Sequence, residues 1–162
     1  MSISTGDRIP EATLMRMGDD GPEEVKLSDR LAGRKVVIFA VPGAFTPTCD
    51  QAHVPSFIRN ADALAAKGVD EIICVSANDP FVMGAWSAST GAAEAGITML
   101  GDPESAFTKA IGMDFSAPPA GLIARSKRYA MVVDDGTVTL LHEEENPGVC
   151  DTSAGEAVAA AL

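Results

Sequence analysis

The chain has 162 residues, of which 46% are hydrophobic and 22% are charged; this is typical of one globular domain spanning residues 1–162 and excludes a disordered chain. Its 12 Lys and Arg residues against 23 Asp and Glu residues give a formal net charge of −11, which disfavours nucleic acid and anionic membrane surfaces as partners. The three cysteines are an odd number and exclude a fully paired internal disulfide framework.

The N-terminal residues 1–8 contain no basic stretch that leads into an apolar run, so we expect no signal peptide. The longest stretches without Asp, Glu, Lys or Arg are residues 36–49 and 80–93. Both are shorter than the roughly 20 residues that a membrane-spanning helix needs. We therefore expect a cytoplasmic protein in a reducing compartment, where cysteines stay free unless they do redox work.

The first two-thirds of the chain alternate buried strands with helices. Residues 36–41 form a continuous β-branched run, typical of a strand covered on both faces, which Pro42 and Gly43 end. After Cys49, apolar positions between residues 54 and 65 fall at helical spacing and predict a helix, with Pro55 in its first turn or at a kink. The same alternation predicts a strand over 70–76, a helix capped at 78–80, a strand over 97–100 and a helix capped at Asp102-Pro103.

The last third of the chain has a different pattern. Two β-rich runs, 129–133 and 137–142, surround an Asp-Gly turn signal and predict a hairpin. An Ala-rich helix over residues 153–162 is expected to close the chain. A βαβ half followed by a hairpin and a terminal helix predicts an α/β, thioredoxin-like fold with a mixed central sheet flanked by helices.

The most informative residue is Cys49, which follows the first buried strand and stands at the start of the predicted helix. Unpaired backbone N–H groups and the helix dipole favour negative charge there, and the thiolate is the nucleophilic form of cysteine. A buried, inert cysteine at a helix start is the alternative interpretation. The Pro42-Gly43 and Thr46-Pro47 turns argue against it, because such turns build a backbone pocket rather than a packed core.

A thioredoxin-type site has Cys-x-x-Cys at this place, whereas this chain has Thr46-Pro-Thr-Cys49. The neighbouring thiol that would release a mixed disulfide is replaced by a hydroxyl. The pattern therefore favours a single attacking thiolate over disulfide exchange.

The pattern Pro42-x-x-x-Thr46-x-x-Cys49 resembles the signature of the peroxiredoxins. Residues 41–49, followed by His-Val-Pro-Ser-Phe at 53–57, are similar to the atypical, type II or peroxiredoxin-5-like subfamily. The similarity covers nearly the whole chain and continues through residues 75–82, Trp86, 101–103 and 125–133.

The resemblance implies a thiol peroxidase that reduces hydrogen peroxide and small organic hydroperoxides and needs no cofactor or metal. Cys49 would be the peroxidatic thiolate that becomes a sulfenic acid, and Thr46 would hydrogen-bond the thiolate and the peroxide. Arg128 would stabilise the thiolate and polarise the O–O bond. Pro42 would shield the sulfur, and the backbone N–H groups of Gly43 and Cys49 would help to hold the peroxide.

Arg128 and the two histidines each have a simpler interpretation. Arg128 stands at the start of a predicted strand and could be a solvated charge, as we expect of Arg125 and Lys127. His53 lies one helical turn after Cys49 and could contact substrate or tune the thiolate, but a packing role is commoner. His142 belongs to no constellation and is expected to be structural.

The resemblance leaves three ways to reduce the sulfenic acid. An external thiol, either glutathione with glutaredoxin or thioredoxin, is our first expectation. Cys150, in a polar turn before the last helix, is the second, although a resolving cysteine in animal-type members falls about two residues later. Cys74 is third, because it lies inside an apolar strand, where the simpler interpretation is a core residue.

Two other functions remain open from the residues alone. A thioredoxin-fold binding or chaperone module without redox activity also fits the missing first cysteine, but it would not need Arg128, Pro42 and Thr46. A disulfide exchanger lacks an adjacent thiol to resolve its mixed disulfide. The resemblance also implies a homodimer, with interface candidates near Phe45, residues 80–81 and Trp86.

Overall fold

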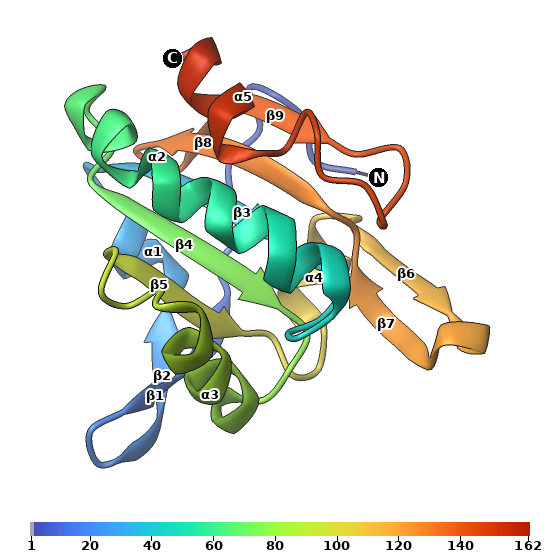
Figure 1. Cartoon of the computed structure of the whole chain (residues 1–162). Coiled ribbons are helices and arrows are strands. Elements are labelled where there is room, and N and C mark those ends of the chain that lie inside the picture. Colours follow the sequence, from blue (N-terminus) through green and yellow to red (C-terminus); the bar gives the residue numbers. More distant parts are fainter. Residues whose placement is uncertain (1) are drawn as a thin grey trace.

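The computed structural model describes residues 2–162, so Met1, with which the expected domain begins, lies outside the described residues. Its main feature is a seven-stranded mixed sheet in the order β2-β1-β5-β4-β3-β8-β9 (Figure 1). The strands of this sheet are β1 (Thr13–Gly18), β2 (Gly21–Lys26), β3 (Lys35–Ala40), β4 (Glu71–Ser76), β5 (Ile97–Gly101), β8 (Tyr129–Asp134) and β9 (Thr137–Glu143).

Strands β3, β4 and β5 are parallel, as the alternation of strands and helices predicts. The β8–β9 hairpin continues the sheet antiparallel to β3. The expected thioredoxin-like fold, with a mixed central sheet flanked by helices, is confirmed.

Helices cover both faces of the sheet. The helical elements of the described residues are α1 (Leu27–Leu31), the π-helical turn η1 (Cys49–His53), α2 (Val54–Ala66), α3 (Pro80–Thr90), α4 (Ala106–Ala110), the 3₁₀ turn η2 (Pro118–Ala120) and α5 (Gly155–Ala161). Within the part of the chain that the structure describes, no helix is both long enough and apolar enough to cross a bilayer.

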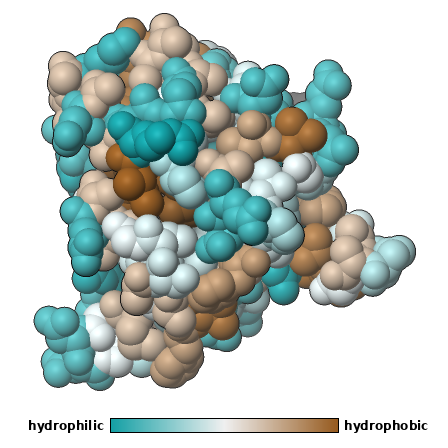
Figure 2. Space-filling model, viewed as in Figure 1, coloured by the Kyte–Doolittle hydropathy of each residue, from teal (hydrophilic) through white to brown (hydrophobic). Residues whose placement is uncertain are grey.

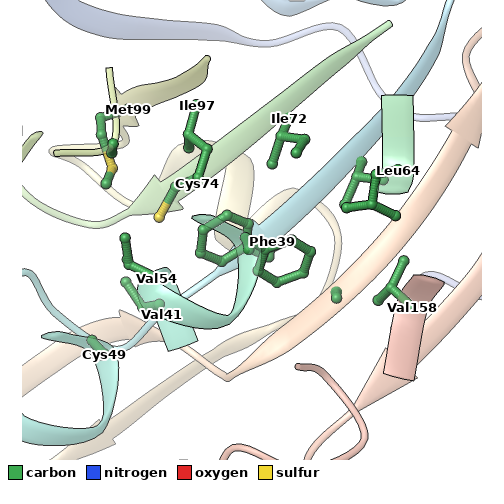
Figure 3. Packing of buried hydrophobic residues seen from close by; sticks show 14 of the residues in the cluster. Phe39, Val41, Cys49, Val54, Leu64, Ile72, Cys74, Ile97, Met99 and Val158 are labelled. Carbon is green, nitrogen blue, oxygen red and sulfur yellow. The ribbon is translucent and has the colours of Figure 1, made fainter. Parts of the chain in front are cut away.

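The continuous apolar runs become central strands because both of their faces are buried. In β3, Val37 and Phe39 enter the cluster under α2, α3 and α5, while Val36 and Ile38 enter the cluster on the opposite face. This alternation is the two-residue period of a strand. In β4 it places Cys74 on the same face as the helix that starts at Cys49, and both cysteines belong to one cluster (Figure 3).

Of the two helix caps predicted from the sequence, one is found where expected and the other is displaced. Asp79 caps α3 through a hydrogen bond from the Val82 N–H, as predicted. The helix expected to be capped at Asp102-Pro103 starts later, at Ala106. Its cap position is Ser105, and the Asp102 carboxylate accepts from the backbone N–H of Thr108, within the helix.

Two hairpins are not predicted by the sequence patterns. The β1–β2 hairpin extends the sheet at one edge, and most of its β2 residues are exposed. The second hairpin consists of β6 (Asp114–Ala117) and β7 (Leu122–Ser126), which form their own two-stranded sheet and project from the body of the molecule (Figure 1). In the four strands of these hairpins the buried residues are Leu14, Val25 and Ser126, so neither hairpin has the continuous buried run that marks a central strand.

Candidate active site

The loop between β3 and α2 presents the thiol of Cys49. The chain leaves β3 at Pro42 and Gly43 and enters the π-helical turn at Cys49, which is fully buried. The loop is held by a hydrogen bond from the Ala44 N–H to the side-chain oxygen of Asn78, 3.0 Å away, in the next strand-to-helix connection. Pro55 then stands in the first turn of α2, as the sequence predicts.

Two polar groups contact the sulfur of Cys49. The Thr46 Oγ1 lies 2.7 Å from the Cys49 Sγ and 2.8 Å from the Gly43 carbonyl oxygen. Arg128 Nη2 donates to the same Sγ across 3.1 Å. The structure therefore brings together Cys49, Thr46 and Arg128, although Arg128 is 79 positions away along the chain.

Arg128 is almost completely buried, and each of its three nitrogens has a partner. Besides the sulfur, Nε donates to the Pro147 carbonyl oxygen at 2.8 Å and Nη1 lies 2.9 Å from His53 Nδ1. Within residues 2–162, Arg128 makes no ion pair with a carboxylate. A buried guanidinium without a counter-ion is costly, so this arrangement stabilises a negative charge on the sulfur. Arg128 is therefore not the solvated charge of the alternative interpretation.

His53 is fully buried, and the two nitrogens of its ring form hydrogen bonds with Arg128 and Ser153, while the ring lies near the rings of Phe39 and Phe57. Its Nε2 is 3.0 Å from the Ser153 carbonyl oxygen. Burial, together with the Arg128 charge, lowers the pKa of His53 to about 3, so the ring is neutral near pH 7. Because a carbonyl oxygen only accepts, Nε2 carries the proton and Nδ1 accepts from Arg128. The unprotonated nitrogen of the ring therefore faces Arg128.

Pro42 and Gly43 form the buried wall of the loop next to Arg125. A side chain at Gly43 would displace the Arg125 guanidinium, because a Cβ atom there would lie 2.8 Å from Arg125 Nη1. That same Nη1 donates to the Pro42 carbonyl oxygen at 3.2 Å. The expectation that Arg125 is simply a solvated charge is therefore wrong, since it is half-buried against the loop that carries the thiol.

A mainly apolar cleft of about 390 Å³ opens beside this group. It lies between the thiol loop, the β6–β7 hairpin and the turn before α5. Its lining residues are Pro42, Thr46, Pro47, Thr48, Phe115, Ala117, Leu122, Arg128, Asn146, Pro147 and Gly148. A small molecule in this cleft would meet both Thr46 and Arg128.

The other two cysteines have different surroundings, and all three cysteines are free thiols. Cys74 is fully buried in β4, and burial, reinforced by Cys49, raises the pKa of its thiol well above the ordinary value. Cys150 is only partly buried, and desolvation raises the pKa of its thiol to about 11. Neither thiol is a thiolate near neutral pH.

The turn before α5 contains site residues that the sequence patterns do not reveal. They are Glu144, Pro147 and Ser153. The Pro147 carbonyl oxygen contacts Arg128, and the Ser153 carbonyl oxygen contacts His53. His142 lies at the start of this turn, with Nδ1 2.7 Å from the Thr152 carbonyl oxygen. Within residues 2–162, no three or more His, Cys, Asp or Glu side chains are grouped to hold a metal ion.

A thioredoxin-like fold that buries one thiol against an arginine and a threonine hydroxyl defines a thiol-dependent oxidoreductase. The family model described as Redoxin matches residues 4–158. Peroxiredoxin-2E-2, chloroplastic, from Oryza sativa subsp. japonica is 48% identical over 165 residues, which cover 99% of this chain and 73% of the relative. Peroxiredoxin-2C from the same organism is 42% identical and covers 99% of this chain and 98% of the relative.

A solved structure of reduced Prx3 from Vibrio vulnificus in complex with H2O2 has a TM-score of 0.91 and 46% identity, and the alignment covers 98% of each chain. The chain belongs to the peroxiredoxins of the Redoxin family, in the type II or peroxiredoxin-5-like group. Its activity is that of a thiol peroxidase, with peroxide as substrate. The resemblance seen in the sequence is thereby confirmed.

Proposed function

We propose that Cys49 is the peroxidatic residue of this thiol peroxidase. Its thiolate attacks one oxygen of the peroxide, the O–O bond breaks, and Cys49 becomes a sulfenic acid while the second oxygen leaves as hydroxide or alkoxide and takes up a proton. Sulfur is oxidised by two electrons and the peroxide is reduced by two. The observation that carries this proposal is the hydrogen bond from the buried, otherwise uncompensated Arg128 to the Cys49 sulfur.

The neighbouring groups take separate roles in this step. Arg128 stabilises the thiolate and the charge that develops on the leaving oxygen. Thr46 donates its hydroxyl proton to the thiolate or to the bound peroxide, which its 2.7 Å contact with the sulfur supports. Pro42 shields the sulfur, the backbone N–H groups of Gly43 and Cys49 hold the peroxide, and His53 assists substrate binding through Arg128.

The cleft beside the thiol favours hydrogen peroxide and organic hydroperoxides as substrates. Its apolar lining, which includes Phe115 and Leu122, can cover an alkyl group while the peroxide oxygens meet Thr46 and Arg128. No cofactor is needed, because the oxidising equivalent is carried on sulfur.

We assign the reduction of the sulfenic acid to an external thiol, either glutathione with glutaredoxin or thioredoxin. The raised pKa of about 11 makes Cys150 a slow internal partner, and Cys74 could reach Cys49 only after local unfolding. Arg125 supports an anionic reductant such as glutathione. Within the described residues it forms no ion pair, so its guanidinium supplies local positive charge at the loop of a protein whose net charge is −11.

The proposal extends to assembly and location. Residues 1–162 form one peroxiredoxin domain that acts in the cytoplasm as a homodimer. Phe45 and Phe81, which are 50% and 63% exposed, support a dimer contact near α3, whereas Trp86 is fully buried and is no longer a candidate. Apolar residues gather on the surface in the region of α3 (Figure 2).

One assay tests the central assignment. Peroxide consumption is measured with dithiothreitol as reductant for the wild type, Cys49→Ser and, as a matched control, Cys74→Ser. We expect activity in the wild type and the control and none in Cys49→Ser. Undiminished activity of Cys49→Ser, or an inactive wild type, would overturn the proposal and favour a binding or chaperone role.

A further inference from the structure

The buried carboxylate of Glu144 lies at the centre of the turn that leads into α5. Its Oε2 atom accepts three hydrogen bonds: from the Asp151 N–H at 2.7 Å, the Ser153 N–H at 2.7 Å and the Ser153 Oγ at 2.6 Å. Burial opposes the charged form, but these hydrogen bonds outweigh it and lower the pKa of Glu144. The side chain is therefore a carboxylate near neutral pH.

Besides its hydrogen bond to the sulfur, Arg128 is held by contacts that come from this same turn, directly or through His53. The Pro147 carbonyl oxygen accepts from Arg128 Nε, and the Ser153 carbonyl oxygen accepts from His53, whose other nitrogen accepts from Arg128. The Glu144 N–H in turn donates to the Arg128 carbonyl oxygen at 3.0 Å. Hydrogen bonds thus form a closed ring through Arg128, His53, Ser153 and Glu144.

The segment between Glu144 and Ser153 has little regular structure of its own. It contains no helix or strand, and Gly148 is joined to the thiol loop by a hydrogen bond from Thr48 Oγ1 to the Gly148 carbonyl oxygen at 2.8 Å. Without the Glu144 carboxylate, Ser153 would lose the partner of both its N–H and its hydroxyl. His53 and Pro147 would then be free to shift, and the Arg128 guanidinium with them.

We propose that Glu144 is a positioning residue for the peroxide step, which acts through Ser153, His53 and Pro147 to hold the Arg128 guanidinium against the Cys49 sulfur. It does not touch the sulfur and is not a catalytic residue. The proposal rests on the proposed function of Cys49 and Arg128, and it adds a role for a residue outside the thiol loop.

A double-mutant cycle on the second-order rate of Cys49 oxidation by hydrogen peroxide tests this role. Glu144→Ala and Glu144→Asp remove or shorten the acceptor, and we expect each to slow oxidation by about tenfold or more, since small misplacements of a catalytic group are costly. Glu144→Gln keeps an oxygen acceptor and should restore most of the rate. Glu145→Gln, at an exposed neighbouring glutamate, is the matched control and should not change it.

Repeating the Glu144→Ala measurement in an Arg128→Ala background shows whether Glu144 acts by positioning Arg128 or by stabilising the whole fold. If Glu144 acts through Arg128, Glu144→Ala should slow the reaction by less than about twofold when Arg128 is already absent. A second readout is the pH dependence of Cys49 alkylation by iodoacetamide, followed on the Cys49 peptide by mass spectrometry. Its midpoint should move to higher pH in Glu144→Ala and stay unchanged in Glu145→Gln.

Several results would overturn the proposal. A folded Glu144→Ala or Glu144→Asp with the wild-type oxidation rate would do so, as would equal slowing in the presence and absence of Arg128. Should Glu144→Ala not fold, the same criteria apply to Glu144→Asp. A wild type that does not react with peroxide would instead overturn the proposed function of Cys49, so the two failures are distinguishable.

Discussion

Cys49 and Cys74 are both fully buried in one hydrophobic cluster (Figure 3), yet their surroundings differ in chemistry. Cys49 stands at the start of a helical turn and receives hydrogen bonds from Thr46 and Arg128. Cys74 stands inside β4 between β3 and β5, opposite Phe39 and Met99. Burial, reinforced by Cys49, raises the pKa of Cys74, whereas a buried cation beside Cys49 favours the thiolate. The difference teaches that the partners of a buried thiol, and not its exposure, decide its reactivity.

The largest effect on the rate of Cys49 oxidation is expected when the Arg128 guanidinium is removed, because Cys49 is then buried without a cation, as Cys74 is. We expect Arg128→Ala to slow oxidation of Cys49 by about 100-fold to 1000-fold, the usual cost of losing a donor aimed at developing charge. Stopped-flow measurement of the peroxide reaction gives the rate, and circular dichroism verifies folding. Arg128→Lys keeps the charge but not the planar fork, so it should recover only part of the rate. A folded Arg128→Ala with nearly normal kinetics would contradict this role.

A smaller effect is expected when the second polar partner of the sulfur is removed. Thr46→Val keeps the side-chain shape but loses the hydroxyl, and a hydrogen bond to a charged group contributes about 1.5–3 kcal/mol. The peroxide step should therefore slow by roughly tenfold to hundredfold. Thr46→Ser, which keeps the hydroxyl, is the control, and equal rates in Thr46→Val and the wild type would exclude the proposed hydrogen bond from the mechanism.

The pH dependence of stability tests the neutral state of His53. Its pKa is about 3 in the folded protein against 6.5 for an unperturbed histidine. The unfolded chain therefore binds a proton between these values that the folded chain does not, so the stability that His53 contributes is complete above pH 6.5 and is lost as the pH falls towards 3. Urea denaturation over this range should show a shallower pH slope for His53→Gln than for the wild type.

The pKa of Glu144 is lowered in the folded protein, so the stability that its carboxylate contributes is also lost as the pH falls. The His53→Gln variant should therefore keep part of the pH slope of the unfolding free energy. Identical slopes in the wild type and His53→Gln would mean that His53 is protonated in the folded protein or does not contribute.

The smallest effect is expected at Cys150. Its thiol has a pKa of about 11, so little thiolate exists at neutral pH to attack a sulfenic acid. Peroxide turnover by Cys150→Ser with glutathione and glutaredoxin should equal that of the wild type. A large loss of turnover, with a Cys49–Cys150 disulfide in non-reducing peptide mass spectrometry of the wild type, would show internal resolution instead.

Sequence patterns identify the elements whose signals are local. The apolar run at 36–41, the turn at Pro42-Gly43 and the threonine at position 46 place Cys49 correctly at the start of a helix. The β8–β9 hairpin follows from its Asp-Gly turn. The β6–β7 hairpin escapes prediction because Ser126 is the one buried residue in its two strands, so no run of buried apolar residues marks them.

The parts of the site that depend on distant contacts are not visible in the sequence. Glu143, Glu144 and Glu145 are identical in type and adjacent, but the middle one is buried, where it accepts hydrogen bonds from Asp151 and Ser153. Arg125 is separated from Arg128 by two residues, yet its position against Pro42 depends on how the β6–β7 hairpin meets the thiol loop. In both cases tertiary packing decides which of several similar charges is used.

The contrast between the two buried thiols is tested most directly by labelling. The reduced protein is treated with one equivalent of hydrogen peroxide in the presence of dimedone, which traps sulfenic acids, and each cysteine peptide is quantified by mass spectrometry. We predict dimedone on Cys49, with Cys74 and Cys150 unmodified. Labelling of Cys74 or Cys150 while Cys49 stays a free thiol would contradict the account.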